Sequence, residues 1–146
     1  MKEHQNLFRD LQEDFRKMKK NLLVAQSGGP TAAINATLAG VIKQAIKEEQ
    51  IDQVYGACYG IQGVLEQKFV NLTEKVDTEE KLEKLKRTPA AALGSCRFKL
   101  NDIKEDDSQY QEIVDILHKM NIGYFVYIGG NDSMDTVAKL SAYCKE

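Results

Sequence analysis

Residues 21–31 read Asn-Leu-Leu-Val-Ala-Gln-Ser-Gly-Gly-Pro-Thr, and this stretch decides the fold. Its apolar run at 22–25 is too short for a helix, and the turn-forming Ser-Gly-Gly-Pro at 27–30 stops it, so we predict a buried strand. After the turn, apolar residues recur at helical spacing over 34–46, which predicts an amphipathic helix. A second strand fits 53–57. Strand, helix and strand in this order form a crossover unit of a parallel sheet.

The rest of the chain repeats the same kinds of element. The stretch 56–63 is punctuated by glycines and is expected to be irregular. The other expected elements are a capped helix over 78–87, a loop over 88–100, a helix over 108–120, a strand over 124–128 that ends at Gly129-Gly130, and a helix over 133–144. The fold class that follows is α/β, with an open, mostly parallel sheet and helices on both faces.

Length and charge restrict the functional classes. The 146 residues suit one domain, and 20 basic against 22 acidic residues leave a formal net charge of −2, which disfavours bulk binding of nucleic acid or of an anionic membrane. No apolar run approaches the roughly 20 residues of a transmembrane helix, so the cytoplasm is the expected compartment. The 3 cysteines are widely spaced and form no CxxC pair, so we expect free thiols.

Residues 1–20 form a separate pattern before the first strand. Leu7, Leu11, Phe15 and Met18 recur at helical spacing with charges of both signs between them, which predicts an amphipathic helical arm. Mixed charge favours packing on its own domain or on a neighbouring subunit over binding a membrane surface. Two parts are therefore expected, the arm and an α/β domain over residues 21–146.

Two predicted strands end in double glycines that lead into helices, at 27–31 and 129–133. In a parallel sheet both loops lie at the carboxyl edge, where helix N–H groups bind phosphate and where glycine permits close approach and positive φ. The alternative is that the glycines only close tight turns, with Ser27 or Thr31 and Asp132 or Ser133 as helix N-caps. Neither loop has the Walker or GxGxxG pattern, so P-loop and dinucleotide-binding sites lose their usual support.

Two charged residues near these loops have both a functional and an ordinary interpretation. Arg97, in Gly-Ser-Cys-Arg-Phe at 94–98, has a planar guanidinium that can bind a phosphate through two hydrogen bonds, or it is a surface arginine. Asp132 can hold Mg²⁺, which takes few carboxylates and keeps water and phosphate oxygens as its other ligands, or it caps a helix.

The stretches 23–29, 93–98 and 128–133 resemble the first three signature blocks of the phosphofructokinase family, in the same order and at similar separations. The resemblance implies a phosphofructokinase-like, Rossmann-like N-terminal domain and phosphoryl transfer to the 1-hydroxyl of fructose 6-phosphate with Mg²⁺. It also implies a homo-oligomer for the whole enzyme.

Carried over residue by residue, the resemblance assigns donor-phosphate binding and catalysis to the three blocks. It implies that Arg97 and Asp132 act in catalysis, Asp132 through donor selection and transition-state support, and that Asn131 or Asp132 holds the metal. The implied donor phosphate-binding residues are Gly28, Gly29, Arg97, Gly130, Asn131, Asp132 and Ser133. Charge neutralisation and in-line positioning are most of what phosphoryl transfer requires of a protein.

The third block also separates phosphoryl donors. ATP-using members of the family read Gly-Gly-Asp-Gly-Ser there, whereas diphosphate-using members commonly carry Asp where Asp132 stands, and that carboxylate would repel the nucleotide α-phosphate. The resemblance therefore implies pyrophosphate as donor, with ATP as the alternative. The family's usual magnesium-associated Asp is replaced by Asn131, which leaves the metal ligand open between the two residues.

One family block does not occur in these 146 residues. It reads Thr-Ile-Asp-Asn-Asp and contains the base for the sugar hydroxyl, so we expect a truncated segment that is inactive alone. A non-catalytic phosphate-binding module is the alternative from a different class. The NAD and lipid kinases share a Gly-Gly-Asp-Gly element with the third block but do not account for residues 94–98.

Overall fold

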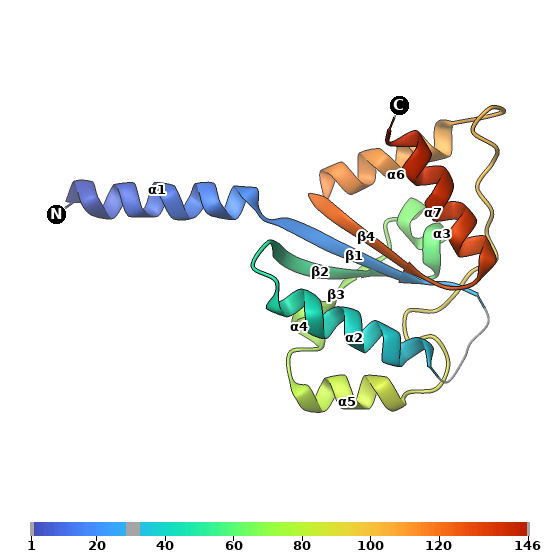
Figure 1. The fold of residues 1–146 in the computed structure, drawn as a ribbon, viewed down its shortest axis with the longest axis horizontal. Helices are drawn as coiled ribbons and strands as arrows, with labels where there is room; N and C mark the ends of the chain where they lie inside the picture. Colours follow the sequence, from blue (N-terminus) through green and yellow to red (C-terminus); the bar gives the residue numbers. More distant parts are fainter. Residues whose placement is uncertain (1, 29–32, 146) are drawn as a thin grey trace.

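A four-stranded sheet forms the centre of the molecule, in strand order β3-β2-β1-β4 (Figure 1). The structure, a computed structural model, describes residues 2–28 and 33–145, with the side chains of all of these except residues 15–17. The strands are β1 (Lys20–Gln26), β2 (Ile51–Ala57), β3 (Phe69–Asn71) and β4 (Ile122–Ile128). β1 pairs in parallel with β2 and with β4, whereas β3 lies antiparallel to β2. The predicted open, mostly parallel sheet is confirmed.

Helices cover both faces of this sheet, as predicted. One face carries α2 (Ile34–Lys47), the short α4 (Leu72–Lys75) and α5 (Glu79–Arg87). The other face carries α3 (Gly60–Leu65), α6 (Ser108–Lys119) and α7 (Asn131–Tyr143). A further helix, α1 (Lys2–Met18), precedes the sheet.

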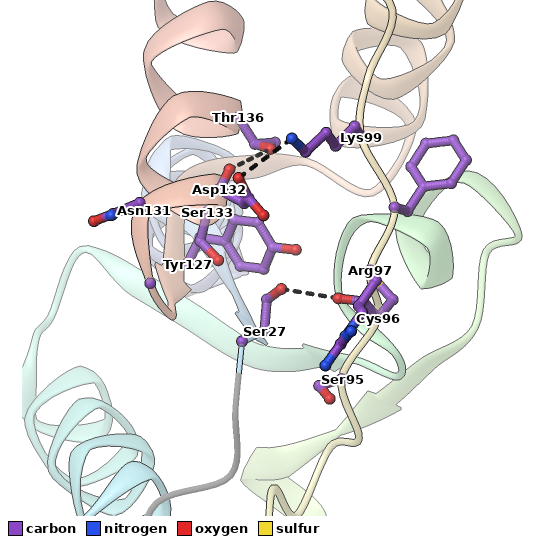
Figure 2. A pocket seen from close by; sticks show the side chains of 13 residues that line it. Ser27, Ser95, Cys96, Arg97, Lys99, Tyr127, Asn131, Asp132, Ser133 and Thr136 are labelled. Carbon is purple, nitrogen blue, oxygen red and sulfur yellow. Dashed lines mark hydrogen bonds and ion pairs between the residues drawn. The ribbon is translucent and has the colours of Figure 1, made fainter.

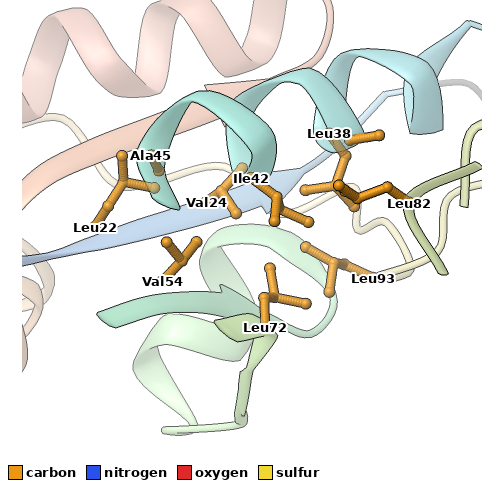
Figure 3. Packing of buried hydrophobic residues seen from close by; sticks show 10 residues of the cluster. Leu22, Val24, Leu38, Ile42, Ala45, Val54, Leu72, Leu82 and Leu93 are labelled. Atoms are coloured by element: carbon orange, nitrogen blue, oxygen red, sulfur yellow. The ribbon is translucent and has the colours of Figure 1, made fainter. Parts of the chain in front are cut away.

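The central strand β1 shows why its sequence is apolar throughout. Because successive side chains of a strand point to opposite faces, Leu22 and Val24 pack into one core and Leu23 and Ala25 into the other. Figure 3 shows the first core, where Leu22 lies beside Ala45 and Val24 beside Ile42 of α2. A strand buried on both faces needs a continuous apolar run rather than alternation.

Most predicted elements are present, with boundaries displaced by one or two residues. The helix predicted over 78–87 begins at Glu79, because Thr78 is its N-cap and accepts a hydrogen bond from the Lys81 N–H at 3.2 Å. α7 begins at Asn131, two residues before the predicted start at Ser133. The prediction of an irregular stretch over 56–63 was wrong at Gly60, where α3 begins. The sequence analysis also missed β3 and α4.

Tertiary contacts explain the glycine that starts α3. Gly60 has φ +62°, and a β-carbon there would lie 2.8 Å from both Cys96 Sγ and the Tyr127 hydroxyl. A residue that reads as a helix breaker is therefore needed for close packing at this point.

The arm helix α1 extends away from the sheet (Figure 1). Leu7, Phe8 and Leu11 each expose more than half of their surface. Of the two expected packing partners, the arm's own domain is therefore wrong for these side chains, because the helix axis leads away from both cores; packing on a neighbouring subunit stays a prediction. Within the described ranges, no helix is long and apolar enough to cross a membrane. All three cysteines carry free thiols, as expected.

Candidate functional site

The carboxyl ends of β1 and β4 bring the two double-glycine loops together. The strands are neighbours in register, with Gln26 opposite Ile128, and the Ser27 N–H donates to the Ile128 carbonyl at 2.7 Å. The prediction that both loops lie at one edge of the sheet is confirmed for Ser27 and Gly28 of the first loop and for Gly129 and Gly130 of the second; residues 29–31 lie outside the described part. This is the edge at which open α/β sheets bind their ligands.

Gly28 is the point at which the two loops touch. It has φ +81°, the left-handed region that favours glycine, and a β-carbon there would lie 3.2 Å from the backbone nitrogen of Gly130. The positive φ expected for this turn is confirmed at Gly28. Gly29, its partner in the predicted donor site, lies outside the described residues.

Gly129 and Gly130 have different surroundings. A β-carbon at Gly129 would collide with the Ser133 side chain and would lie 2.9 Å from the Ser27 carbonyl oxygen. A β-carbon at Gly130 would meet no described atom within 4 Å, because this residue borders open space. Gly129 is therefore required for packing, and Gly130 leaves room beside the backbone.

Neither helix after a double glycine is capped by a side chain. The N-cap of α7 is Gly130 and that of α2 is Ala33, and neither makes a side-chain capping bond. The alternative in which Asp132 or Ser133 caps the second helix is therefore wrong, as is Ser27 as a cap of α2; Thr31 lies outside the described residues. The Ser133 N–H donates to the Gly130 carbonyl at 3.1 Å, so the start of α7 offers the N–H groups of Asn131 and Asp132 to a ligand.

A third wall comes from residues 95–99, which carry the arginine singled out from the sequence. With the two loops, this wall encloses a cavity of about 860 Å³ (Figure 2). The described residues that line it are Ser27, Gly28, Ser95, Cys96, Arg97, Phe98, Lys99, Tyr127, Gly130, Asn131, Asp132, Ser133 and Thr136. Every residue assigned to the donor site by resemblance lines this cavity, except Gly29, which is not described.

Cations and a single carboxylate define the charge of the cavity lining. Arg97 and Lys99 bring positive charge to the cavity. Among the described lining residues, Asp132 carries the one carboxylate. Lys99 Nζ lies 3.7 Å from Asp132 Oδ1, and both side chains are nearly four-fifths exposed, at 79% and 78%. Water screens the attraction between two groups so exposed. The Lys99 ammonium can therefore leave the Asp132 carboxylate and bind an anionic ligand instead. The sequence analysis missed Lys99, although its position two residues after Arg97 places it on the same extended wall.

A buried hydroxyl at the start of α7 has no protein partner. Ser133 is 3% exposed. Among the described residues, its Oγ is the one buried side-chain oxygen or nitrogen that has no hydrogen-bond partner. Buried polar groups are normally hydrogen-bonded, and leaving one unpaired costs about 1–3 kcal/mol. An unpaired hydroxyl in a cavity wall is a group that a ligand can satisfy.

Tyr127 is a further lining residue that the sequence analysis missed. Its hydroxyl accepts a hydrogen bond from the Ile61 N–H at 3.2 Å, which ties β4 to α3. Burial raises the pKa of the Tyr127 phenol above its ordinary value, so the hydroxyl stays protonated at neutral pH. Its position at the carboxyl end of the predicted strand, next to the second glycine loop, was the available signal, since ligands bind at that edge of an open α/β sheet.

The possible metal ligands lie at the start of α7. Figure 2 shows the Asn131 amide pointing to the opposite side of α7 from Asp132 and Lys99. Over residues 2–28 and 33–145, no cluster of three or more His, Cys, Asp or Glu side chains could hold a metal ion. A cation here would depend on one carboxylate together with oxygens from a ligand and water, which is the donor set that Mg²⁺ commonly takes beside phosphates.

The chain is similar to known proteins over most of its length. The pyrophosphate–fructose 6-phosphate 1-phosphotransferase of Rhodospirillum rubrum is 44% identical over 123 residues, which are 84% of this chain and 29% of the relative. ATP-dependent 6-phosphofructokinase 3 of Bacteroides thetaiotaomicron is 32% identical over 122 residues, 82% of this chain and 34% of that protein. The chain thus spans about a third or less of the length of these relatives.

A solved structure has the same fold. The crystal structure of pyrophosphate-dependent phosphofructokinase from Nitrosospira multiformis superposes with a TM-score of 0.78 at 37% identity. The match covers 86% of this chain and 30% of that one. Residues 21–146 match the family model described as phosphofructokinase. The cavity at the ends of β1 and β4 therefore belongs to a chain of the phosphofructokinase family.

Proposed function

We propose that this chain provides the donor-binding site of an enzyme that transfers a phosphoryl group from pyrophosphate to the 1-hydroxyl of fructose 6-phosphate. The observation that carries the proposal is the cavity at the sheet edge, which is lined by residues of all three sequence blocks. The Ser133 hydroxyl in its wall has no hydrogen-bond partner among the described residues. The relatives named for this reaction support the choice of substrates. ATP as donor is the rival outcome of the test below.

The lining residues have distinct roles in the proposal. Arg97 binds oxygens of the donor through two hydrogen bonds of its guanidinium, and Lys99 adds a point charge beside them. The N-terminus of α7 contributes backbone N–H groups and the positive end of its dipole, and Ser133 donates its hydroxyl. Such preorganised donors neutralise the charge that accumulates on a transferring phosphoryl group.

Asp132 selects the donor in this proposal. Its carboxylate borders the cavity and is exposed to it, so the α-phosphate of ATP, which lies beyond the β- and γ-phosphates, would meet negative charge. Pyrophosphate ends before that point. Specificity then results from repulsion of the larger donor as much as from attraction of the smaller one.

We propose Mg²⁺ as the cofactor, held by Asp132 together with donor oxygens. Asp132 fits, because its carboxylate lies at the cavity beside the cationic groups that bind the donor. Asn131 fits less well, since its amide points to the other side of α7 (Figure 2). When bound, the ion would supply charge neutralisation of the pyrophosphate oxygens.

The organisation of the whole protein belongs to the same proposal. The proposed arm over residues 1–20 contains α1, with β1 beginning at its last residue, Lys20, and the proposed donor-binding domain spans residues 21–146. The phosphofructokinase reaction is a step of glycolysis, so the cytoplasm is the proposed compartment, and a homo-oligomer is the proposed state of the whole enzyme.

Binding and activity measurements test the proposal separately. Calorimetric titration of this chain with magnesium pyrophosphate is expected to show saturable binding, and magnesium ATP is expected to bind more weakly. A chimera in which this chain replaces the matching segment of the Rhodospirillum rubrum enzyme is expected to form fructose 1,6-bisphosphate from pyrophosphate. A chimera that folds and works better with ATP than with pyrophosphate would contradict the proposed donor.

A further inference from the structure

The wall that carries Arg97 has no regular structure of its own. From Thr88 to Asp107 the chain forms neither helix nor strand. Ala90 adopts φ +62° in this stretch, a conformation that residues other than glycine rarely take. Such a backbone persists only where its surroundings impose it. The shape of this wall must therefore come from neighbouring elements.

Two buried amides impose that shape. Gln26 is the last residue of β1 and Asn35 lies in the first turn of α2, and both are 0% exposed. Gln26 Nε2 donates to Asn35 Oδ1 at 3.1 Å, which joins the two side chains. We call this pair the amide clamp.

The clamp binds four backbone groups of residues 88–93. Asn35 Nδ2 donates to the carbonyl of Thr88 at 2.7 Å and to that of Ala90 at 2.5 Å. Asn35 Oδ1 accepts the Ala92 N–H at 2.9 Å, and Gln26 Oε1 accepts the Leu93 N–H at 2.9 Å. With Gln26 Nε2 also 3.4 Å from the Ile34 carbonyl, every amide nitrogen and oxygen of the pair is used.

Two further bonds continue the restraint toward the cavity. The Leu93 carbonyl accepts from the Tyr59 N–H at 2.8 Å. Ser27 Oγ donates to the Cys96 carbonyl at 3.3 Å, directly before Arg97 (Figure 2). Gln26 and Ser27 are consecutive, so the strand that carries the first glycine loop also fixes the wall that carries the arginine.

We propose that Gln26 and Asn35 are positioning residues that hold Arg97 at the donor site. The inference rests on the proposed function, because the ligand that Arg97 binds is taken from it. A guanidinium that binds two phosphate oxygens needs a fixed backbone, since displacement of about 1 Å from productive geometry is costly. The amides act through Arg97 and do not touch the ligand themselves.

A double-mutant cycle tests whether the amides act through Arg97. The variants are Asn35→Ala, Arg97→Ala and the two combined, and the readout is the Kd of this chain for magnesium pyrophosphate. We expect each single change to weaken binding about tenfold or more, which corresponds to about 1.4 kcal/mol. In the Arg97→Ala background, Asn35→Ala is expected to add less than about twofold, because coupled residues are non-additive. Additive losses would overturn the proposal.

Hydrogen exchange gives a readout that does not depend on the ligand. Asn35→Ala is expected to speed exchange of the amides at 88–98 while those of β1 and β4 keep their protection. Uniform loss of protection, or unchanged exchange at 88–98, would overturn the positioning role. If the unchanged chain does not bind magnesium pyrophosphate, the proposed function fails, and exchange still decides whether the clamp fixes this wall.

Controls separate positioning from loss of stability. Ile113→Val removes one methyl group from the core formed with α6, where Ile113 is 0% exposed and its side chain has no hydrogen bond to make. It is expected to lower the thermal midpoint without changing the pyrophosphate Kd. If Asn35→Ala does not fold, Gln26→Met takes its place, because methionine keeps the length of the side chain and removes the bonds to Leu93 and Asn35. Pyrophosphate affinity that follows the thermal midpoint in all variants would overturn the proposal.

Discussion

Gly129 and Gly130 are neighbours in the chain, yet a β-carbon at each would meet different surroundings. At Gly129 it would collide with Ser133, and at Gly130 it would enter open space beside the cavity. The φ of Gly130 is −94°, which other residues adopt without strain. Gly129 is therefore required for packing, whereas Gly130 leaves room for a ligand beside the backbone.

Alanine substitutions at these two positions are expected to affect different properties: Gly129→Ala mainly the stability of the chain, and Gly130→Ala mainly ligand binding. Gly129→Ala should destabilise the chain by about 1–3 kcal/mol, as overpacking does. Gly130→Ala should cost about 1 kcal/mol, because alanine is a poorer N-cap than glycine, and it should also weaken pyrophosphate binding by crowding the helix N–H groups. Thermal unfolding and calorimetry on both variants make the comparison. Equal stability losses would contradict this account of the loop.

Asp132→Gly tests the role of the carboxylate in donor choice. The ratio of Kd for magnesium ATP to Kd for magnesium pyrophosphate is expected to fall about tenfold, because repulsion of the α-phosphate is worth about 1.4 kcal/mol. Asp132→Asn keeps the volume of the side chain and removes its charge, so this variant shows whether the charge or the volume of Asp132 excludes ATP. Asp135→Asn, one turn further along α7 and paired with Lys139, is the matched control. An unchanged ratio in Asp132→Gly would show that donor selection lies elsewhere.

Among the elements, α5 is a charged surface helix whose start depends on one side chain. Thr78 accepts a hydrogen bond from the Lys81 N–H, and Glu79 and Glu80 occupy the first turn, where negative charge favours a helix. Of this helix, Leu82 is the buried residue and contributes to the core beneath α2. With so little apolar burial, α5 needs its cap.

Thr78→Ala is expected to lower the free energy of unfolding by about 1 kcal/mol through loss of that cap. Thr78→Ser and Thr78→Asp retain a side-chain acceptor and should restore most of the stability. Urea denaturation of the three variants measures the difference. A loss of the same size in all three would show that the methyl group of Thr78, rather than its hydroxyl, stabilises the helix.

For the molecule as a whole, the two cores and the arm contribute very differently to stability. The cores on the two faces of the sheet contain the fully buried side chains, such as Leu23 and Leu38. α1 extends beyond them and exposes Leu7, Phe8 and Leu11 (Figure 1). Folding of the sheet domain should therefore not depend on the arm.

Deletion of residues 2–18 is expected to shift the thermal midpoint by no more than about 2 °C, because exposed side chains contribute little to stability. Leu38→Ala, in the core beneath α2, is the contrasting variant and should lower it by about 10 °C. Calorimetry on both proteins measures these shifts. A fall of similar size on deletion of the arm would show that α1 stabilises the sheet domain.

The sequence predicted those parts of the fold that depend on local pattern. Apolar runs of strand length and helical periodicity identified β1, β2, β4 and the longer helices, because burial against a sheet imposes those periods. The sequence analysis did not predict three short elements, α3, β3 and α4. They carry too few residues for periodicity to show, and Gly60 is explained by close packing against Cys96 and Tyr127.

The same division applies to the candidate site. The resemblance of the three blocks to a known family assigned Arg97, Asp132 and Ser133 to the site, whereas local chemistry alone left each with an ordinary interpretation; all three line the cavity. Lys99 and Tyr127 join them only through the cavity. The unpaired state of Ser133 Oγ and the different surroundings of Gly129 and Gly130 are likewise properties of the folded chain.

The amino-acid sequence by itself determined the α/β class, the order of the main strands and helices, and the family resemblance, since each depends on neighbours along the chain. Only the tertiary structure shows that Gln26 and Asn35 bind the backbone of residues 88–93, the stretch that leads into the wall carrying Arg97. The physical reason is that both amides bond to backbone groups more than 50 residues away, which any residue can provide. Such contacts leave no pattern in the sequence, because the partner is the peptide backbone and not a side chain.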